Sequence, residues 1–311
     1  MSNLSTYVLI TPARNEAKFI EQTIRSVIAQ TVRPAVWVIV SDGSTDGTDE
    51  IVLRYAAANP WMELLRMPER KERHFAGKVN AFDAGYARAK QVPHGFLASL
   101  DADITFDARY FEYLLGQLAE DERLGLVGTP FQDGPNPIYD YRFVNIEHVS
   151  GACQLFRREC FEQIGGYRAI KGGGIDYFAV ISARMHGWKT RTFTDMQCVH
   201  HREMGTAQHG VLTSRFKYGL KDYAFGNHPL WEIARTLYQF TRRPFLLGGS
   251  AVLCGYVWAA CQRKQRVVTE EMVAFTRREQ ILRLQRFVRR YDILRKSSFS
   301  RISHGAATHP N

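Results

Sequence analysis

Short apolar runs alternate with segments of helical periodicity along the first two hundred residues. The apolar runs predict buried strands at residues 7–11, 36–40, 62–65, 96–100 and 124–128. Between them, apolar positions recur at helical spacing near residues 19–28, 46–58, 77–90 and 110–118. This alternation is typical of an α/β fold in which helices cover both faces of a mostly parallel sheet.

Polar clusters follow three of these strands, at residues 12–16, 42–48 and 101–103. Ligands of such sheets bind at the carboxyl ends of the strands, so the three clusters predict one site. Asp42 stands at its strand end, where a carboxylate can accept the ring N–H of a base; uracil and guanine both present one. The turn that follows has a simpler interpretation, in which Thr45 or Asp46 caps the next helix.

Asp101 and Asp103 end the fourth predicted strand two residues apart. Like charges this close cost energy unless a positive group lies between them. The alternative is that one of them caps a helix, although Asp107 is better placed for that role. The pair therefore raises the question of its counter-ion.

Three motifs together carry a family resemblance. TPARNE (Thr11–Glu16), SDGSTDGT (Ser41–Thr48) and LDAD (Leu100–Asp103) follow one another in this order. Their order and spacing resemble the nucleotide-sugar glycosyltransferases of family 2, over roughly residues 5–205. The resemblance implies the GT-A fold, a Rossmann-like α/β domain with a mostly parallel sheet.

The resemblance implies a nucleotide pocket at the first two strand ends. In that family the Pro-Ala-x-Asn-Glu segment lines the nucleoside pocket, which points to Pro12, Ala13 and Glu16, with Arg14 nearby. The carboxylate of the second strand end holds the base, which would be Asp42.

The Asp-x-Asp motif of the resemblance implies a divalent cation. Mg²⁺ or Mn²⁺ prefers oxygen ligands and would offset the repulsion between Asp101 and Asp103. Both aspartates are candidate metal ligands; Asp103 is preferred as the direct ligand, with Asp101 serving the ribose or a metal-bound water as the alternative. Many enzymes of this fold add a histidine, here His200 or His201, with His200 preferred; a structural histidine pair is the alternative. Arg202 is a further candidate contact for the diphosphate.

Two more segments match the family pattern. Lys78 would lie near the diphosphate, where a point cation helps, rather than being a solvated helix lysine. Asp83 stands where the family more often has Asn and is left out of the site. A glycine-rich loop at residues 165–174 leads to Asp176, which matches the catalytic base, although Ile175 replaces the usual preceding acid. Such a base takes the proton of an acceptor hydroxyl; a helix-capping aspartate is the alternative.

Charge is unevenly distributed and separates two regions. Residues 200–311 hold 19 Lys and Arg against 7 Asp and Glu, whereas the first 199 residues hold 22 against 24. We therefore predict a glycosyltransferase domain at residues 1–205 and a helical, basic region at 206–311. A basic region of this kind can meet an anionic membrane or nucleic acid. It contains no nucleic-acid recognition module, so no specific nucleic-acid partner is expected.

The basic region contains an uncharged run of 17 residues, 245–261. As a helix it would measure roughly 26 Å, shorter than a hydrocarbon core of about 30 Å. Basic residues flank it on both sides, and an arginine-rich helix that favours anionic headgroups follows it. The run predicts association with a membrane surface; a buried or oligomerising helix is the alternative.

The remaining composition bears on the compartment. Five cysteines are scattered without a CxxC pair, which suits a reducing compartment and predicts neither a zinc site nor a disulfide framework. The first residues show no basic stretch followed by an apolar run, so no signal peptide is predicted. The expected location is cytoplasmic, at the cytoplasmic face of a membrane.

The residues and the resemblance together predict a metal-dependent, inverting glycosyltransferase. It would move a sugar from a nucleoside-diphosphate sugar, a UDP-sugar being favoured, to a lipid-linked or polysaccharide acceptor. Residues 129–146 and the glycine-rich loop would shape the choice of both substrates. A sugar nucleotidyltransferase is a second candidate, but residues 11–19 lack the glycines of its phosphate loop. A non-catalytic nucleotide-sugar binder that regulates an assembly is the third, and the oligomeric state is left open.

Overall fold

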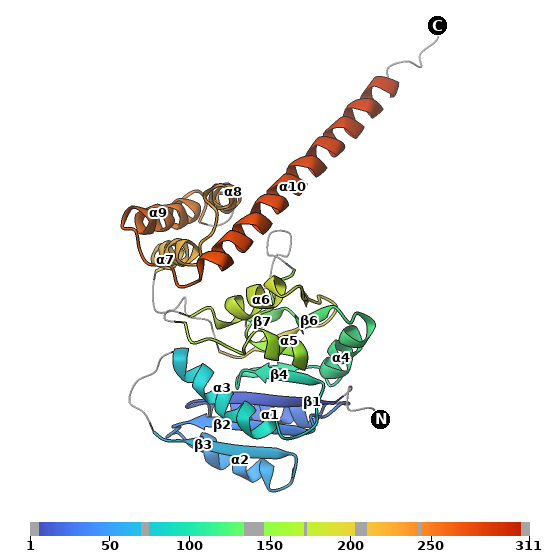
Figure 1. Cartoon of the computed structure of the whole chain (residues 1–311), viewed down its shortest axis with the longest axis vertical. Coiled ribbons are helices and arrows are strands. Elements are labelled where there is room, and N and C mark those ends of the chain that lie inside the picture. Colours follow the sequence, from blue (N-terminus) through green and yellow to red (C-terminus); the bar gives the residue numbers. More distant parts are fainter. Residues whose placement is uncertain are drawn as a thin grey trace. The chain divides into compact units, whose positions relative to one another are not determined.

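The computed structural model describes residues 6–69, 75–133, 146–170, 173–202, 210–241 and 244–305. The chain divides into two compact units, Met1–Gly205 and Thr206–Asn311 (Figure 1). Most of the segment 129–146, predicted to shape substrate choice, lies outside the described residues.

A seven-stranded sheet forms the centre of the first unit, in the order β3-β2-β1-β4-β8-β6-β9. Its strands are β1 (Tyr7–Ala13), β2 (Val36–Asp42), β3 (Met62–Met67), β4 (Phe96–Leu100), β6 (Leu124–Gly128), β8 (Cys153–Arg157) and β9 (Lys189–Thr192). Neighbouring strands are parallel, except that β8 runs antiparallel to both β4 and β6. The α/β class and the five predicted strands are confirmed. β9 reads Lys-Thr-Arg-Thr at the sheet edge and has no apolar run that would have predicted it.

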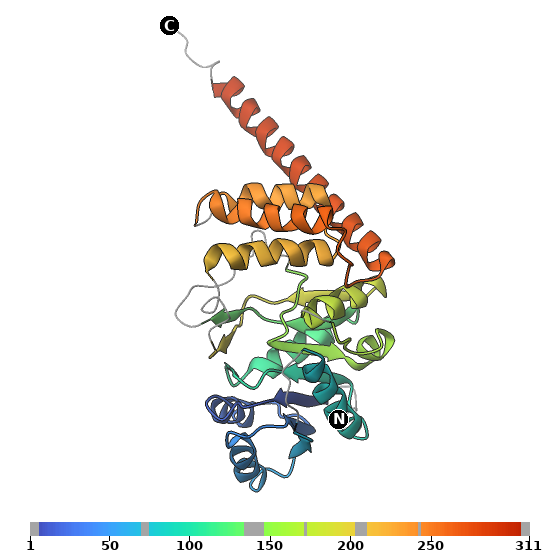
Figure 2. The same ribbon diagram turned by 90° about the vertical axis from the view of Figure 1, so that its left-hand side faces the viewer.

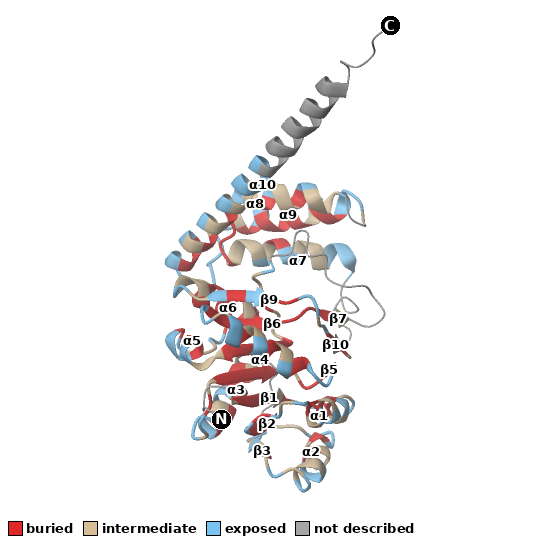
Figure 3. Ribbon diagram, turned by 90° about the vertical axis from the view of Figure 1, so that its right-hand side faces the viewer, coloured by how far each residue is buried: buried red, intermediate tan, exposed pale blue. Residues whose placement is uncertain are grey.

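Successive side chains of the central strands enter two different cores. Tyr7 and Leu9 of β1 belong to one core, whereas Val8 and Ile10 belong to the other. The first core is covered by α1 (Ile20–Ile28), α2 (Thr48–Ala56) and α4 (Tyr110–Glu120), and the second by α3 (Phe75–Ala89), α5 (Arg158–Gln163) and α6 (Ile175–Met185). Figure 3 shows the sheet as largely buried. Burial on both faces explains why these strands are continuous apolar runs instead of alternating ones.

A small second sheet lies beside the end of β4. It contains β5 (Ile104–Phe106), β10 (Cys198–His200) and β7 (Phe131–Asp133), in that order. β10 is antiparallel to β5 and parallel to β7. The register pairs His200 with Ile104, so a residue near the end of this unit comes beside the Asp-x-Asp segment.

The second unit is built from helices. They are α7 (Val211–Ala224), α8 (Pro229–Gln239), α9 (Leu247–Cys261) and α10 (Glu270–Gly305). α9 packs against both α7 and α8, and Figure 2 shows these helices running alongside one another. Glycines bring α7 and α9 together: a Cβ on Gly219 would lie 1.9 Å from the carbonyl oxygen of Val252, and one on Gly255 would lie 2.1 Å from that of Phe216.

The uncharged run at residues 245–261 therefore becomes α9, a helix of 15 residues. Its residues at positions 248, 249, 252, 255, 256 and 259 are buried. Within the described part of the chain, no helix is both long enough and apolar enough to cross a membrane.

Candidate active site

The ends of β1 and β2 lie side by side, as the sequence predicts. The parallel register pairs Pro12 with Val40 and Ala13 with Ser41. Asp42, the last residue of β2, is therefore next to the end of β1, and its side chain is buried. Arg14 follows directly after β1 and is half-buried. The residues proposed for the nucleoside pocket thus come from two adjacent strand ends.

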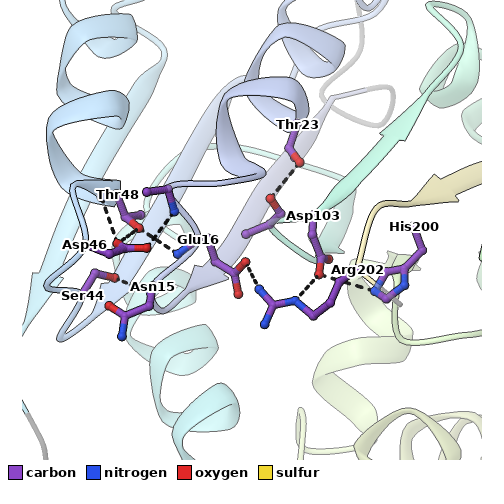
Figure 4. A network of polar contacts seen from close by, with 11 residues as sticks. Asn15, Glu16, Thr23, Ser44, Asp46, Thr48, Asp103, His200 and Arg202 are labelled. Carbon is purple, nitrogen blue, oxygen red and sulfur yellow. Dashed lines mark hydrogen bonds and ion pairs between the residues drawn. The ribbon is translucent and has the colours of Figure 1, made fainter. Parts of the chain in front are cut away.

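Side-chain hydrogen bonds tie these two strand ends together (Figure 4). The amide of Glu16 donates to Thr48 Oγ1 at 2.8 Å, and the amide of Ala17 donates to Asp46 Oδ2 at 3.0 Å. Asn15, which has a positive φ of 55°, accepts from the amide of Thr45 at 2.9 Å. The turn after β2 therefore holds the loop after β1 in place.

Asp46 combines this cross-link with the start of α2. Its Oδ1 accepts from the amide of Thr48 at 3.1 Å, although Gly47 occupies the N-cap position. Burial alone would raise the pKa of Asp46, but the hydrogen bonds from Thr48 and from the amide of Ala17 outweigh it and lower the pKa. The capping interpretation of Asp46 captures one part of this role, and the contact with Ala17 adds a second.

Three separate segments fix the backbone of the Asp-x-Asp loop. Thr23 Oγ1 of α1 donates to the carbonyl of Ala102 at 2.8 Å. The amide of Asp101 donates to the carbonyl of Ala152, and the amide of His201 donates to the carbonyl of Asp103, both at 2.9 Å. The two carboxylates are therefore held on a loop whose backbone is anchored at each of the three residues of the motif.

Asp101 pairs with Lys78 of α3. Burial alone would lower the pKa of Lys78, but Asp101, Asp176 and Asp103 together raise it. Burial raises the pKa of Asp101, Lys78 opposes this rise, and Asp103 adds to it. Lys78 is thus one of the positive groups that the aspartate pair requires.

Asp103 faces a second set of positive groups (Figure 4). Arg202 Nε donates to Asp103 Oδ2 at 3.1 Å, and Arg202 also forms an ion pair with Glu16. His200 Nε2 lies 3.5 Å from the same Oδ2. The guanidinium stacks 5.5 Å from the ring centroid of Phe19. Arg202 therefore joins the first strand end to the Asp-x-Asp loop.

The donor set around Asp103 suits a divalent cation. A carboxylate oxygen and an imidazole nitrogen at this separation are ligand types that Mn²⁺ accepts, and Mg²⁺ accepts the former. Among the described residues, no three His, Cys, Asp or Glu side chains form a complete metal-binding group. A cation held by Asp103 and His200 would thus need further ligands, such as phosphate oxygens. His201 Nε2 lies 2.8 Å from Thr105 Oγ1, and a ligand role for it remains a prediction.

Asp176 lies in the first turn of α6. Gly174 occupies the N-cap position, so Asp176 is inside the helix, where the helix dipole favours a carboxylate. His148 Nε2 lies 3.7 Å from Asp176 Oδ2. A Cβ on Gly151 would come within 3.2 Å of the Cβ of Asp176, so a residue without a side chain makes room beside it. The carboxylate is about one third exposed and accessible.

Several of these contacts have no signal in the sequence. Thr23 and Thr48 lie in helices where a hydroxyl has no periodic signal, and His148 lies in a loop. Arg202 was considered for the diphosphate, but its pairing with Glu16 joins positions 186 residues apart and no local pattern reveals it.

Part of the first unit is similar to a known protein family. The family described as Glycosyl transferase family 2 matches residues 8–142. A poly-beta-1,6-N-acetyl-D-glucosamine synthase from Staphylococcus aureus (strain COL) is 30% identical over 117 residues, 37% of this chain and 26% of the synthase. A 4,4'-diaponeurosporenoate glycosyltransferase from Staphylococcus aureus is 28% identical over 204 residues, 58% of this chain and 52% of that protein. The chain thus matches about a quarter of the first relative's length and about half of the second's.

Solved structures share the architecture. The mannosyltransferase PcManGT from Pyrobaculum calidifontis, in complex with GDP-Man and Mn²⁺, superimposes with a TM-score of 0.55 at 19% identity, over 89% of this chain and 80% of that one. Residues 1–349 of Staphylococcus aureus TarS, in complex with UDP-GlcNAc, superimpose with a TM-score of 0.52 at 14% identity, over 81% and 71%. Residues 8–142 therefore resemble glycosyl transferase family 2, and the first unit has the GT-A fold of the solved glycosyltransferases.

Proposed function

We propose that the chain is a metal-dependent, inverting glycosyltransferase that uses a nucleoside-diphosphate sugar. The observation that carries this proposal is that both aspartates of the Asp-x-Asp loop are paired with basic side chains, Asp101 with Lys78 and Asp103 with Arg202. Asp176, more than seventy residues further along the chain, raises the pKa of Lys78 together with these two aspartates. A nucleotide pocket at the ends of β1 and β2 borders the same loop through Glu16 and Arg202.

Asp176 is the proposed general base. Its carboxylate would accept the proton of an acceptor hydroxyl while that oxygen attacks the anomeric carbon of the donor. The new glycosidic bond forms as the bond from the anomeric carbon to the diphosphate oxygen breaks, and the diphosphate leaves with the electron pair. Attack from the face opposite the leaving group inverts the anomeric configuration. A single carboxylate is sufficient for this step, so Ile175 before it does not remove the function.

Positive groups are placed for the leaving diphosphate. Lys78 and Arg202 are both bound to aspartates of the Asp-x-Asp loop, and both can offer N–H donors to phosphate oxygens. A cation held by Asp103 and His200 would supply Lewis-acid stabilisation of the diphosphate. The presence of Mn²⁺ in the PcManGT structure supports a divalent cation here.

Asp42 is the proposed contact to the base. Its buried carboxylate would accept a ring N–H at the end of β2. We favour a UDP-sugar, and the TarS complex with UDP-GlcNAc supports this choice, whereas the PcManGT complex with GDP-Man keeps guanine as the alternative. The names of the relatives support a polysaccharide or lipid-type acceptor. The basic charge of the second unit supports a location at the cytoplasmic face of a membrane.

The decisive experiment replaces Asp176 with Asn. We expect D176N to bind the nucleotide sugar with unchanged affinity and to lose between about a hundredfold and ten-thousandfold in transfer or donor hydrolysis. Glu159→Gln is the matched control, because Glu159 is an exposed acid in the first turn of α5. Unchanged turnover in D176N would refute the base assignment.

A nucleotide panel tests the donor and the rival functions. Thermal unfolding with UDP, GDP and their sugars, with and without Mn²⁺, should show stabilisation that requires both nucleotide and cation. A nucleotidyltransferase would instead release pyrophosphate from a nucleoside triphosphate and a sugar phosphate. A regulatory binder would show the same stabilisation in wild type and D176N without turnover in either.

A further inference from the structure

Helix α8 of the second unit buries polar side chains and exposes apolar ones. Glu232 and Thr236 are 0% and 3% exposed. Leu230, Ile233 and Leu237 are 55%, 48% and 59% exposed. Their spacing of three and four residues places the three apolar side chains on one face of the helix. This is the reverse of the pattern expected for a helix whose outer face meets water.

The inner partners of α8 leave this outer face without a covering among the described residues. The carbonyl of Thr236 and the ring of Phe240 lie against Gly249 of α9, so close that a Cβ on Gly249 would come within 3 Å of both. Tyr256 of α9 donates to the carbonyl of Asn227 at 2.7 Å, just before α8 begins. These contacts fix which side of α8 faces inward.

The connection between α8 and α9 also exposes apolar side chains. Phe245, Leu246 and Leu247 are 57%, 61% and 60% exposed. Among the described residues, the large apolar side chains that are exposed lie almost entirely in the second unit, the exceptions being Leu53 and Ile146. Six of these fifteen side chains of the second unit lie on α8 and at residues 245–247, and the others lie on α7, α9, α10 and the connection between α9 and α10.

The charges of the same segment specify what can cover this surface. Residues 210–269 contain two acids, Asp222 and Glu232, and nine Lys or Arg. Both acids are turned inward, Asp222 in an ion pair with Arg235. The exposed charged side chains of the segment are all basic: Lys217, Lys221, Arg263, Lys264 and Arg266. A partner that covers the exposed apolar side chains and also meets the exposed basic ones must present both an apolar region and anionic groups. An anionic bilayer presents both.

We propose that the α8 face (Leu230, Ile233, Leu237 and residues 245–247) inserts into the interface of an anionic lipid bilayer. The apolar side chains enter the boundary between headgroups and acyl chains, and the exposed basic side chains contact the phosphates. The membrane contact therefore lies on α8 and its following turn, while the apolar run of α9 is used for packing on α7. This deepens the proposed membrane location, but it concerns binding and needs neither donor nor metal.

The test is flotation of the full chain with vesicles of phosphatidylcholine alone or mixed with phosphatidylglycerol. We expect binding to the mixed vesicles and much weaker binding to phosphatidylcholine. The variant L230Q/I233Q/L237Q should lose at least about a hundredfold in partitioning. Leu53→Gln removes an equally exposed leucine from the first unit and should bind like wild type. The variant R263Q/K264Q/R266Q should weaken binding to mixed vesicles by about ten- to a hundredfold.

Several outcomes would overturn the proposal. The first is that wild-type protein does not bind the mixed vesicles. The second is that L230Q/I233Q/L237Q binds like wild type while R263Q/K264Q/R266Q loses binding, which would indicate charge attraction alone. A dimer that dissociates in the apolar variant, with vesicle binding intact, would assign the α8 face to a second copy. Circular dichroism checks folding, and F245Q/L247Q provides a second apolar variant if the first fails to fold. Donor hydrolysis in detergent-free buffer is measured separately, so failure of the catalytic proposal is distinguishable.

Discussion

Arg202 Nε donates to Asp103 Oδ2 across 3.1 Å, joining two residues that are 99 positions apart in the chain. The other end of the same guanidinium pairs with Glu16. The guanidinium of Arg202 thus pairs with two carboxylates. Glu16 follows the strand end proposed to bind the nucleotide, and Asp103 follows the strand end proposed to bind the metal ion. Arg202 is therefore a group that neutralises the charge of Asp103.

We predict that Arg202→Gln makes the protein more dependent on a divalent cation. Without the guanidinium, Asp103 and Glu16 lose their common partner, which should lower the free energy of unfolding by about 2 kcal/mol. Mn²⁺ should then raise the unfolding temperature of R202Q by more than it raises that of wild type. Arg158→Gln, which breaks a surface pair with Glu162, is the control. Equal Mn²⁺ shifts in all three proteins would contradict the shared-partner interpretation.

A second prediction concerns the link between the β1 and β2 ends. Thr48→Val removes the hydroxyl that accepts from the amide of Glu16 and is buried. Leaving that amide unpaired should cost about 1–3 kcal/mol in stability. Because the proposed nucleoside pocket includes this loop, affinity for the nucleotide should fall as well, and calorimetric titration would measure it. Thr31→Val removes an exposed hydroxyl of the same unit and should change neither the stability nor the affinity. A T48V protein with native affinity would show that nucleotide binding does not need the hydrogen bond between Glu16 and Thr48.

Glycines in the second unit provide a third prediction. Gly219→Ala would place a methyl group 1.9 Å from the carbonyl oxygen of Val252, so α7 and α9 must separate. We expect a loss of at least about 2 kcal/mol in the unfolding free energy, measured by denaturant titration. Gly116→Ala is the matched control, because a Cβ there meets nothing within 4 Å and the position lies inside α4. That variant should be neutral or more stable by up to about 1 kcal/mol. Similar behaviour of the two variants would show that α7 and α9 are not packed this closely.

Local patterns predicted the parts of the fold that local forces determine. The five apolar strands follow from short runs that need burial on both faces, although β1 and β2 each extend two residues past the predicted end, to Ala13 and Asp42. β8 and the small sheet were not predicted, because β5, β7 and β10 are each three residues long and exist only through pairing between distant segments. Strand pairing of this kind is a tertiary property.

The same distinction applies to the candidate site. Asp101, Asp103 and Asp176 stand in motifs, so their proximity could be expected from the family resemblance. The sequence also predicts Lys78 and Arg202 near the diphosphate, but not their ion pairs with Asp101 and Asp103, because these pairs join segments that are distant in the chain. The inverted burial of α8 was also missed, since periodicity shows that a helix has two faces but does not show which face is turned inward.

The last prediction concerns pH and Glu232, the buried carboxyl on the inner face of α8. Burial, with a smaller contribution from Asp222, raises the pKa of Glu232 from 4.5 to about 7. The folded state therefore binds this proton more tightly than the unfolded state does. The resulting stabilisation is fully present below pH 4.5 and is lost as the pH rises through 7, at a cost of about 3 kcal/mol.

Glu232→Gln keeps the shape and removes the charge, so it should raise the unfolding temperature at pH 8 and leave it nearly unchanged at pH 4. Thermal unfolding followed by circular dichroism across this range measures the difference. Glu271→Gln, an exposed acid in the first turn of α10, is the control and should show no such trend. A difference between E232Q and wild type that stays constant with pH would mean that Glu232 titrates normally, and a decrease at pH 8 would mean that its charge is compensated in the fold. Either result would show that the cost of burying an ionised Glu232 does not control the stability of α8 with its polar face turned inward.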